Sequence, residues 1–581
     1  MKWRGVLIAE SLVGDHVIWD RVEVRGRSKG RLEREGSRGA LHPSGYRFAG
    51  PCMVLLGLLA LAAVPAQAEM PADALVMAKD ISDIITLDPA EAFELTTGEL
   101  LANVYDRIMT FEPEDPTVLT GGVAESHAVS DDGRTVTFRI RDGLTFHSGN
   151  PVRPEDVEFS LERAVLLDRS PSFIVTQFGW NADNVGELIE VVDDRRVRIT
   201  IAEGFSPGLV LNALSAGVAS VVDRELVLAH ERDGDLGSGW LQTNSAGSGP
   251  FRVSSWKAGD AVVLEANPGH RRGPPGVQRV VLRHVSEPRA QRRLLEAGEV
   301  DVACDLTPEL VAALAGNVEV AVDDHPKGVV VYLAANASHP ILGDDRVVHA
   351  LRHAVDYHGM VESFLAGQFI VHQAFWPRGL WAAYTETPYR LDLPRASSLL
   401  AQAGHGGGLA VRLDTLDSPP YPAIAEAVRQ TLARIGVQAQ VVTQEGAELW
   451  PRYRAREHEL ILAPWSPDYV DPHANADAFA RNPDNRPEAG LTGVLAWRNA
   501  WARDDVNAAV VEARDELDPE RRKLLYFDLQ RRLQAEGPYV VMFQQTDQIA
   551  RRTHVTGFVS GPNFDHVWYR LATKEPSVSG A

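Results

Sequence analysis

The sequence predicts an α/β protein, because strand-like and helix-like segments alternate along the chain from Leu75 onward. Thr135–Ile140 alternates apolar and polar residues with period two, as a half-buried strand does. Residues 154–165 begin with proline and carry acids in the first turn, which is typical of a helix N-terminus. Residues 422–435 place apolar side chains on one helical face, and residues 437–441 then alternate as a strand. A length of 581 residues allows two or three domains.

Two further segments extend this pattern. Residues 247–256 read Gly-Ser-Gly-Pro-Phe-Arg-Val-Ser-Ser-Trp and are followed by a second apolar run at 262–268, which predicts a glycine turn and a two-stranded hairpin. Ser286 is expected to cap a helix that runs to Ala297 and ends at Gly298, before a short strand at 300–303.

The first 68 residues differ from the rest. Residues 53–64 are apolar and end at an Ala-Gln-Ala sequence closed by Ala68, which predicts a secretory signal peptide cleaved near that residue. The apolar run is shorter than the roughly 20 residues that a spanning helix needs, although an uncleaved anchor is the alternative. The chain is therefore expected in the periplasm, and residues 1–50 are expected to form no domain. Cleavage would leave Cys304 as the single cysteine, without a disulfide partner.

The formal net charge of −21 argues against nucleic acid and anionic membranes as partners. An acidic surface keeps an exported protein soluble and does not by itself define a site.

Six blocks of sequence, in order, carry a resemblance to a known family. They are residues 86–89 with 103–107, residues 137–161, the glycine turn and hairpin at 247–268, residues 295–301, residues 346–356 and residues 465–472. Together they resemble the extracytoplasmic solute-binding proteins of family 5, the dipeptide, oligopeptide and nickel group that serves ABC transporters. The resemblance implies a ligand-capturing protein without enzymatic activity or a cofactor.

The resemblance also implies an architecture, a two-lobed periplasmic binding protein-like fold of type II with an extra subdomain inserted in lobe I. Lobe I would span residues 69–328, with the insertion at about 106–240, lobe II residues 329–542, and residues 543–581 would return to lobe I. Two strands would cross between the lobes, at residues 329–333 and at residues 539–543. Ligand would sit between the lobes, which close around it by hinge motion. The implied partners are a small solute and the ABC permease and ATPase complex, and the protein is expected to be a monomer.

The segment Trp465-Ser-Pro-Asp468 carries the strongest site prediction. In peptide-binding relatives the aspartate at this motif position pairs with the ligand's α-amine, and the tryptophan walls the pocket. The resemblance therefore makes Asp468 the amine anchor and Trp465 a wall residue. The alternative is that Asp468 only shapes the Asp-Pro turn, a role that we expect for Asp471.

Three further residues are candidates for the cleft. Trp376 offers a stacking face and Arg378 a guanidinium for a carboxylate, although surface packing is an equal alternative for each. Tyr421 closes a Pro-Tyr pair that dipeptide-binding relatives precede with an arginine, where this chain has Pro419. The carboxylate half of the peptide signature is thus absent at that position. Either Arg378 substitutes, or the ligand is longer than a dipeptide, or it is an amine-bearing metabolite such as an opine.

Two alternatives stay open. A metal chelate would be the ligand if His349, His353 or His473 supplied imidazole, since His349 and His353 stand four residues apart on a predicted helix. An exported serine hydrolase would use Ser206, whose surroundings fit the pattern G-x-S-x-G. Pro207 argues against it, because the residue after the nucleophile must donate a backbone N–H to the oxyanion. Ser206 is better interpreted as a helix cap.

Overall fold

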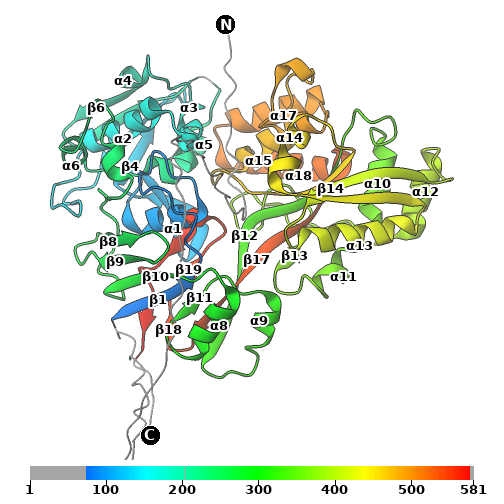
Figure 1. Ribbon diagram of the computed structural model, residues 1–581. Coiled ribbons are helices and arrows are strands. Elements are labelled where there is room, and N and C mark those ends of the chain that lie inside the picture. The colour runs from blue at the N-terminus through cyan, green and yellow to red at the C-terminus, as the bar shows by residue number, and fades with distance from the viewer. Residues whose placement is uncertain (1–72, 203, 576–581) are drawn as a thin grey trace, which may run out of the picture. The chain divides into compact units, whose positions relative to one another are not determined.

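The computed structural model of the protein describes residues 73–202 and 204–575 (Figure 1). The predicted N-terminal extension and signal peptide, residues 1–68, lie outside the described residues. Strands and helices alternate through the described chain and confirm the α/β class.

A sheet of eleven strands connects the two lobes. Its order is β15-β14-β16-β12-β17-β11-β1-β10-β9-β8, with β13 (Phe369–Val371) paired to β17. The long strands β12 (Val320–Ala335) and β17 (Tyr539–Arg552) lie antiparallel, side by side (Figure 1). Residues 330–335 of β12 pair with β16, whereas β17 pairs with β11 near its other end. The pairing of β12 with β17 is interrupted between Pro326 and Val330, so the backbone is irregular where the sheet passes between lobes.

Lobe I is built on the end of this sheet that runs from β11 to β8. The predicted hairpin is confirmed as β8 and β9, and β1 pairs in parallel with β10 and β11. These strands are β1 (Ala74–Lys79), β8 (Phe251–Lys257), β9 (Ala261–Ala266), β10 (Arg279–His284) and β11 (Val302–Ala303). The helices here are α1 (Leu95–Val104), α6 (Arg224–Leu228), α7 (Ser238–Leu241), α8 (Pro288–Glu296) and α9 (Pro308–Ala312). The C-terminal tail joins the same core through the short strands β18 (Val555–Thr556), β19 (Val559–Ser560), β20 (Val567–Trp568) and β21 (Thr573–Lys574).

A four-stranded antiparallel sheet with its own core forms within the predicted insertion. Its order is β4-β5-β7-β6, and apolar residues of α2 and α5 share its core. The strands are β4 (Ala124–Val129), β5 (Thr135–Ile140), β6 (Ile189–Asp193) and β7 (Arg196–Thr200), preceded by the pair β2 (Met109–Glu112) and β3 (Asp115–Gly121). The helices are α2 (Pro154–Leu167), α3 (Phe173–Thr176), α4 (Val185–Leu188) and α5 (Pro207–Ala213), with short 3-10 turns at Ser170–Ser172 and Gly217–Ala219.

Lobe II packs helices around the end of the large sheet that is formed by β15, β14 and β16. In Figure 1 α10, α12 and α13 lie together beside β14, and one buried apolar cluster joins them to the strands. The strands are β14 (Leu409–Leu416), β15 (Val437–Gln444) and β16 (Leu460–Trp465). The helices are α10 (Asp345–Ala354), α11 (Tyr357–Val361), α12 (Leu393–Gln402), α13 (Tyr421–Ala433), α14 (Gly446–Arg454), α15 (Pro472–Ala480), α16 (Leu495–Arg498), α17 (Asp504–Asp515) and α18 (Pro519–Glu536). The predicted boundaries at 328 and 542 fall inside β12 and β17, and the domain limits stay a prediction.

Buried polar residues of the N-terminal motifs tie lobe I together. The side chain of Asn103 donates to the carbonyls of Glu99 and Val567 and accepts the Tyr569 amide, which fastens α1 to the C-terminal tail. Asp88 forms a bidentate ion pair with Arg163, with both side chains almost fully buried. These motif residues therefore have structural roles.

One predicted helix cap is wrong. The N-cap of α8 is Glu287, whose carboxylate accepts from the Arg289 amide, and the helix starts at Pro288. Proline is favoured in the first turn, so it sets the start one residue later than a Ser286 cap would.

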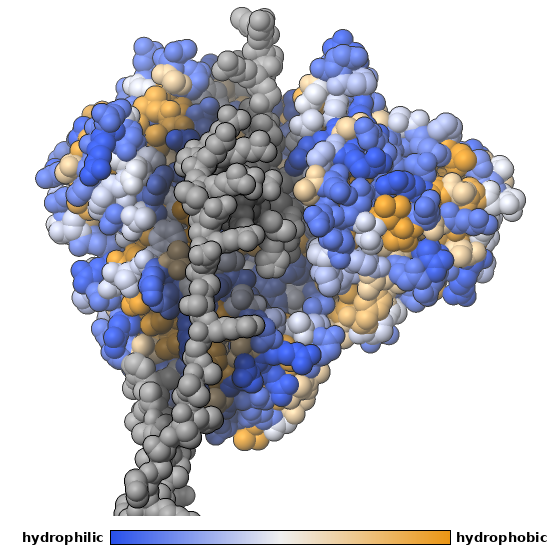
Figure 2. Space-filling view, in the orientation of Figure 1, coloured by the Kyte–Doolittle hydropathy of each residue, from blue (hydrophilic) through white to orange (hydrophobic). Residues whose placement is uncertain are grey.

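The visible surface is dominated by hydrophilic residues, with apolar residues in small groups (Figure 2). No helix in residues 73–202 or 204–575 is both long and apolar enough to cross a membrane.

Candidate functional site

The loop between β16 and α15 positions Asp468. Strand β16 ends at Trp465, and Asp471 begins the next helix as its N-cap, accepting from the amide of His473. Asp468 therefore lies in a turn fixed at both ends. Its side chain is half-buried and lines a small cavity.

The cavity around Asp468 is otherwise apolar. It has an empty volume of about 270 Å³, its open mouth included. Its walls come from four other segments, and they include Phe93, Ile174, Val218 and Phe564. Ligand pockets are mostly apolar with a few placed polar groups, and among the residues that line this cavity only Asp468 is charged.

An aromatic cluster shapes one wall. Phe93 packs edge-to-face against Phe564, with ring centroids 6.4 Å apart, and against Phe173 at 5.9 Å. Gly98 of α1 faces this cluster, and a Cβ atom there would overlap the Phe564 ring. The absence of a side chain at Gly98 is thus what lets Phe564 reach the cavity.

Asp471 has the turn role that the sequence predicts, and it also forms a buried ion pair. Its carboxylate is fully buried and receives two hydrogen bonds from Arg522, at 2.7 and 2.9 Å. Burial alone would raise the pKa of Asp471, but the Arg522 guanidinium and the hydrogen bonds hold it below its usual value. Asp471 and Arg522 are therefore both charged, and their ion pair has a structural role.

The same turn contacts the four-stranded subdomain. Asn212 of α5 donates from Nδ2 to Oδ2 of Asp471 at 2.7 Å. Tyr469 donates to Oε1 of Gln177 at 3.3 Å, and its ring belongs to the apolar core of that subdomain. Asp468, Tyr469 and Asp471 thus all contact the insertion or line a cavity with it.

Trp465 lies beside the turn but does not line the Asp468 cavity. Its indole donates to Oδ1 of Asn475 at 3.0 Å, and its ring meets Phe479 edge-on at 6.0 Å. The side chain is half-buried, so its wall role stays a prediction.

The other three candidates also lie away from this cavity. Trp376 has no exposed surface, and its indole donates to the carbonyl of Trp381 at 2.8 Å, so it has no free stacking face here. Tyr421 is buried in the core of lobe II, where burial raises the pKa of its hydroxyl. Arg378 is exposed, and its backbone exchanges hydrogen bonds with the side chain of Gln544.

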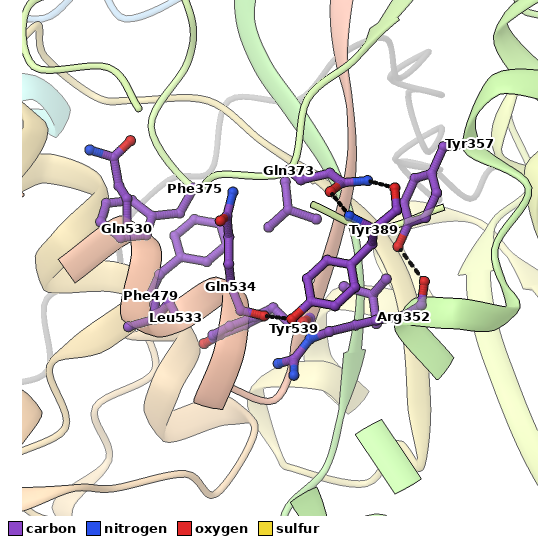
Figure 3. A pocket seen from close by; sticks show the side chains of 12 residues that line it. Arg352, Tyr357, Gln373, Phe375, Tyr389, Phe479, Gln530, Leu533, Gln534 and Tyr539 are labelled. Carbon is purple, nitrogen blue, oxygen red and sulfur yellow. Dashed lines mark hydrogen bonds between the residues drawn. The ribbon is translucent and has the colours of Figure 1, made fainter. Parts of the chain in front are cut away.

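A second cavity, of about 320 Å³, lies within lobe II (Figure 3). Gln373 exchanges two hydrogen bonds with the backbone of Tyr389, whose hydroxyl donates to the carbonyl of Gln534. Arg352 donates to three carbonyls at the C-terminal end of α18 and at the start of β17, including those of Ala535 and Tyr539. These polar groups serve packing, whereas the buried hydroxyl of Tyr539, which also lines the cavity, has no hydrogen-bond partner among the described residues.

The three histidines of the chelate alternative have different local environments. His349 shares a hydrogen bond of 2.6 Å with the carbonyl of Ala535, and His353 packs against Tyr389. His473 is buried, and burial lowers its pKa to about 4. Within the described residues, no three or more His, Cys, Asp or Glu side chains are grouped to hold a metal ion.

Ser206 is the N-cap of α5, as predicted. Its hydroxyl accepts from the Leu209 amide, and only 1% of the residue is exposed. Phe178 and Trp180 are buried in the core of the inserted subdomain.

Sequence reasoning missed the residues that form the cavity walls. Phe93, Ile174 and Phe564 come from three distant segments, and none belongs to a periodic pattern or motif that singles it out. Only Asp468 among the five candidates lines this cavity.

Comparison with known proteins gives the family. Residues 118–486 match the bacterial extracellular solute-binding proteins, family 5, in the profile of their middle region. The chain is 27% identical over 507 residues to the probable D,D-dipeptide-binding periplasmic protein DdpA of Escherichia coli, covering 87% of this chain and 94% of that protein.

Solved structures show the same fold. HbpA2 from Haemophilus parasuis aligns with a TM-score of 0.75 and 22% identity, covering 87% of this chain and 100% of that one. NikZ from Campylobacter jejuni, solved in complex with Ni(L-His), aligns with a TM-score of 0.68 and 21% identity, with 87% and 100% covered. At these identities the likeness establishes the two-lobed fold alone. The profile match, which spans more than half of the sequence, establishes that the chain belongs to the bacterial extracellular solute-binding proteins of family 5.

Proposed function

We propose that this solute-binding protein captures a short peptide, or another small solute with a charged amine, and delivers it to an ABC permease. The observation that carries the proposal is the carboxylate of Asp468 in an otherwise apolar cavity. In that setting a solute ammonium group is the natural partner, and the aromatic wall formed by Phe93 and Phe564 accommodates an apolar side chain. The name of the Escherichia coli relative, a D,D-dipeptide-binding periplasmic protein, supports both the ligand class and the compartment.

Binding would be coupled to closure of the lobes. The two long strands β12 and β17 connect the lobes, and the irregular pairing near Pro326 gives a place for bending. Contacts from the Asp468 turn to the inserted subdomain, such as Asn212 to Asp471, belong to the closed arrangement. A ligand then shifts the population toward closure to the extent that it binds the closed form more tightly.

Isothermal titration calorimetry with a panel of ligands tests the proposal. The panel holds L- and D-dipeptides, tripeptides, opines and the same peptides with an acetylated amine. We expect saturable binding of at least one free-amine ligand and none of its acetylated form. Asp468→Asn keeps the side-chain volume but removes the charge, and it should weaken binding by about 10- to 150-fold, since a hydrogen bond to a charged group contributes roughly 1.5–3 kcal/mol.

Asp417→Asn is the matched control. Asp417 is exposed in lobe II and does not line the cavity, so this variant should bind like the parent protein. Equal affinity for free and acetylated peptides would contradict the amine anchor. Binding of nickel–histidine but of no amine ligand would favour the chelate alternative, for which His473 and His349 would then be replaced in turn.

A further inference from the structure

A third cavity lies in lobe I near the C-terminal end of α1. Leu101 lines the cavity of Asp468, whereas the next residue, Ala102, lines this one together with Tyr105. The remaining walls come from residues 106–113, from Pro250, from the loop after β9 and from the C-terminal tail. The empty volume is about 490 Å³, its open mouth included.

Several arginine side chains line this cavity. Arg271 donates to Oδ1 of Asp106 at 3.2 Å, and Arg272 forms a bidentate pair with Glu112 at 2.8 and 3.0 Å. Arg570 lines the same cavity, half-buried, and donates a hydrogen bond of 3.1 Å to the carbonyl of Arg272. The two carboxylates are thus taken up by other arginines.

Arg570 therefore carries positive charge without a matching acid. Among the described residues, no carboxylate lies within 4.0 Å of its guanidinium. Burial, and next the like charge of Arg272, lower the pKa of Arg570, whereas the carboxylates of Glu114 and Glu112 oppose this effect. Burial likewise lowers the pKa of Arg271, with Arg272 adding to the effect and Asp106 opposing it. An anion in the cavity would relieve this repulsion.

His270 adds an unused donor. Only 7% of the residue is exposed, and neither ring nitrogen has a hydrogen-bond partner among the described residues. The shortest ion-pair distance of its Nε2 is 3.6 Å, to Oδ1 of Asp106. Buried polar groups in proteins are nearly always satisfied, so this imidazole is available to a ligand in the cavity.

We infer that this cavity binds a small oxyanion, a phosphate or a small carboxylate, held by Arg570, Arg271 and His270. Guanidinium groups recognise the paired oxygens of both anions, and an imidazole N–H adds a third donor. The site is separate from the proposed amine site, because the two cavities share no lining residue. An anion here would bind with or without the transported solute.

Calorimetry and thermal unfolding of the purified protein test the inference. Inorganic phosphate and succinate are added separately, and sodium chloride keeps the ionic strength constant. We expect a saturable rise in melting temperature with at least one anion. Saturation with phosphate alone identifies a phosphate site, and saturation with succinate alone identifies a carboxylate site.

Arg570→Gln removes the unpaired charge and should raise the dissociation constant of that anion about tenfold or more. His270→Gln is a second variant, which removes the imidazole donor and should also raise the dissociation constant of that anion. Arg289→Gln, at an exposed position of α8, is the matched control and should leave the anion affinity unchanged.

Asp468→Asn should also leave the anion affinity unchanged, so failure of this inference is distinguishable from failure of the proposed amine site. A shift that never saturates, no shift with either anion, or equal affinity in Arg570→Gln would overturn the inference.

Discussion

The contact between Asn212 and Asp471 gives the sharpest test of closure. Asn212 lies in α5 of the inserted subdomain, and Asp471 lies at the start of α15 in lobe II. Their hydrogen bond of 2.7 Å joins an amide to a fully buried carboxylate. Asn212→Ala removes this bond alone, since Asp471 keeps both bonds to Arg522 and its cap of α15.

The expected effect follows from the kind of bond that is lost. A hydrogen bond to a charged group contributes roughly 1.5–3 kcal/mol, so the closed form of Asn212→Ala is destabilised by about 10- to 150-fold. If the free protein is mostly open, ligand affinity falls by the same factor. The loss should appear in the dissociation rate, because the open form that meets the ligand is unchanged.

Stopped-flow tryptophan fluorescence and calorimetry with one amine ligand measure both quantities. Asn181→Ala is the matched control, because Asn181 is exposed in the same subdomain and its side chain accepts only from the nearby Asp183 amide. A dissociation constant within twofold of the parent value in Asn212→Ala would refute the role of this bond in closure.

Three further predictions concern cavity shape and stability. Gly98→Ala should displace the Phe564 ring from the cavity wall and lower ligand affinity by about tenfold, because overpacking costs about 1–3 kcal/mol. Gly407→Ala is the control, since a Cβ there meets open space and should leave ligand affinity unchanged. Burial lowers the pKa of His458 to about 4 from 6.5, so the unfolded chain takes up a proton first as the pH falls. Stability should therefore decrease between pH 6.5 and pH 4, and His458→Gln should flatten that decrease by up to about 3 kcal/mol in urea titrations. Arg163→Met strands the buried Asp88 carboxylate and should cost about 3–5 kcal/mol in the same assay, a loss that adding Asp88→Asn should partly restore; an unchanged midpoint in the single variant would contradict this.

Local patterns predicted the elements of this fold well. Strand β5, helix α2 and helix α13 appear within two residues of the expected limits, because alternation, prolines and terminal glycines act over a few residues. Strand β15 begins where expected and runs three residues further. The Ser206 cap followed from the same local logic. Neither local patterns nor the family resemblance predicted the order of the eleven strands, since pairing between β1 and β10 joins segments some 200 residues apart.

The candidate site was harder to predict, because exposure is decided by the whole fold. Trp376 and Tyr421 occupy positions that resemble cleft residues, yet both pack in the interior of lobe II. In contrast, Phe564 reaches the cavity only because Gly98 leaves room for its ring, and Phe93 packs against that ring. No local signal in the sequence links residues so far apart.

Asp468 and Asp471 show how the same side chain takes two roles three positions apart. Asp471 meets a guanidinium, an asparagine amide and a backbone N–H, so its charge is neutralised within the protein. Asp468 lines an otherwise apolar cavity, where we propose that its carboxylate binds a cationic solute. Both lie in one short turn that is fixed by α15, and a solute that draws Asp468 toward the insertion also brings Asp471 toward Asn212. One short turn would therefore couple solute binding to lobe closure. For that reason Asn212→Ala should weaken solute binding although Asn212 does not contact the solute.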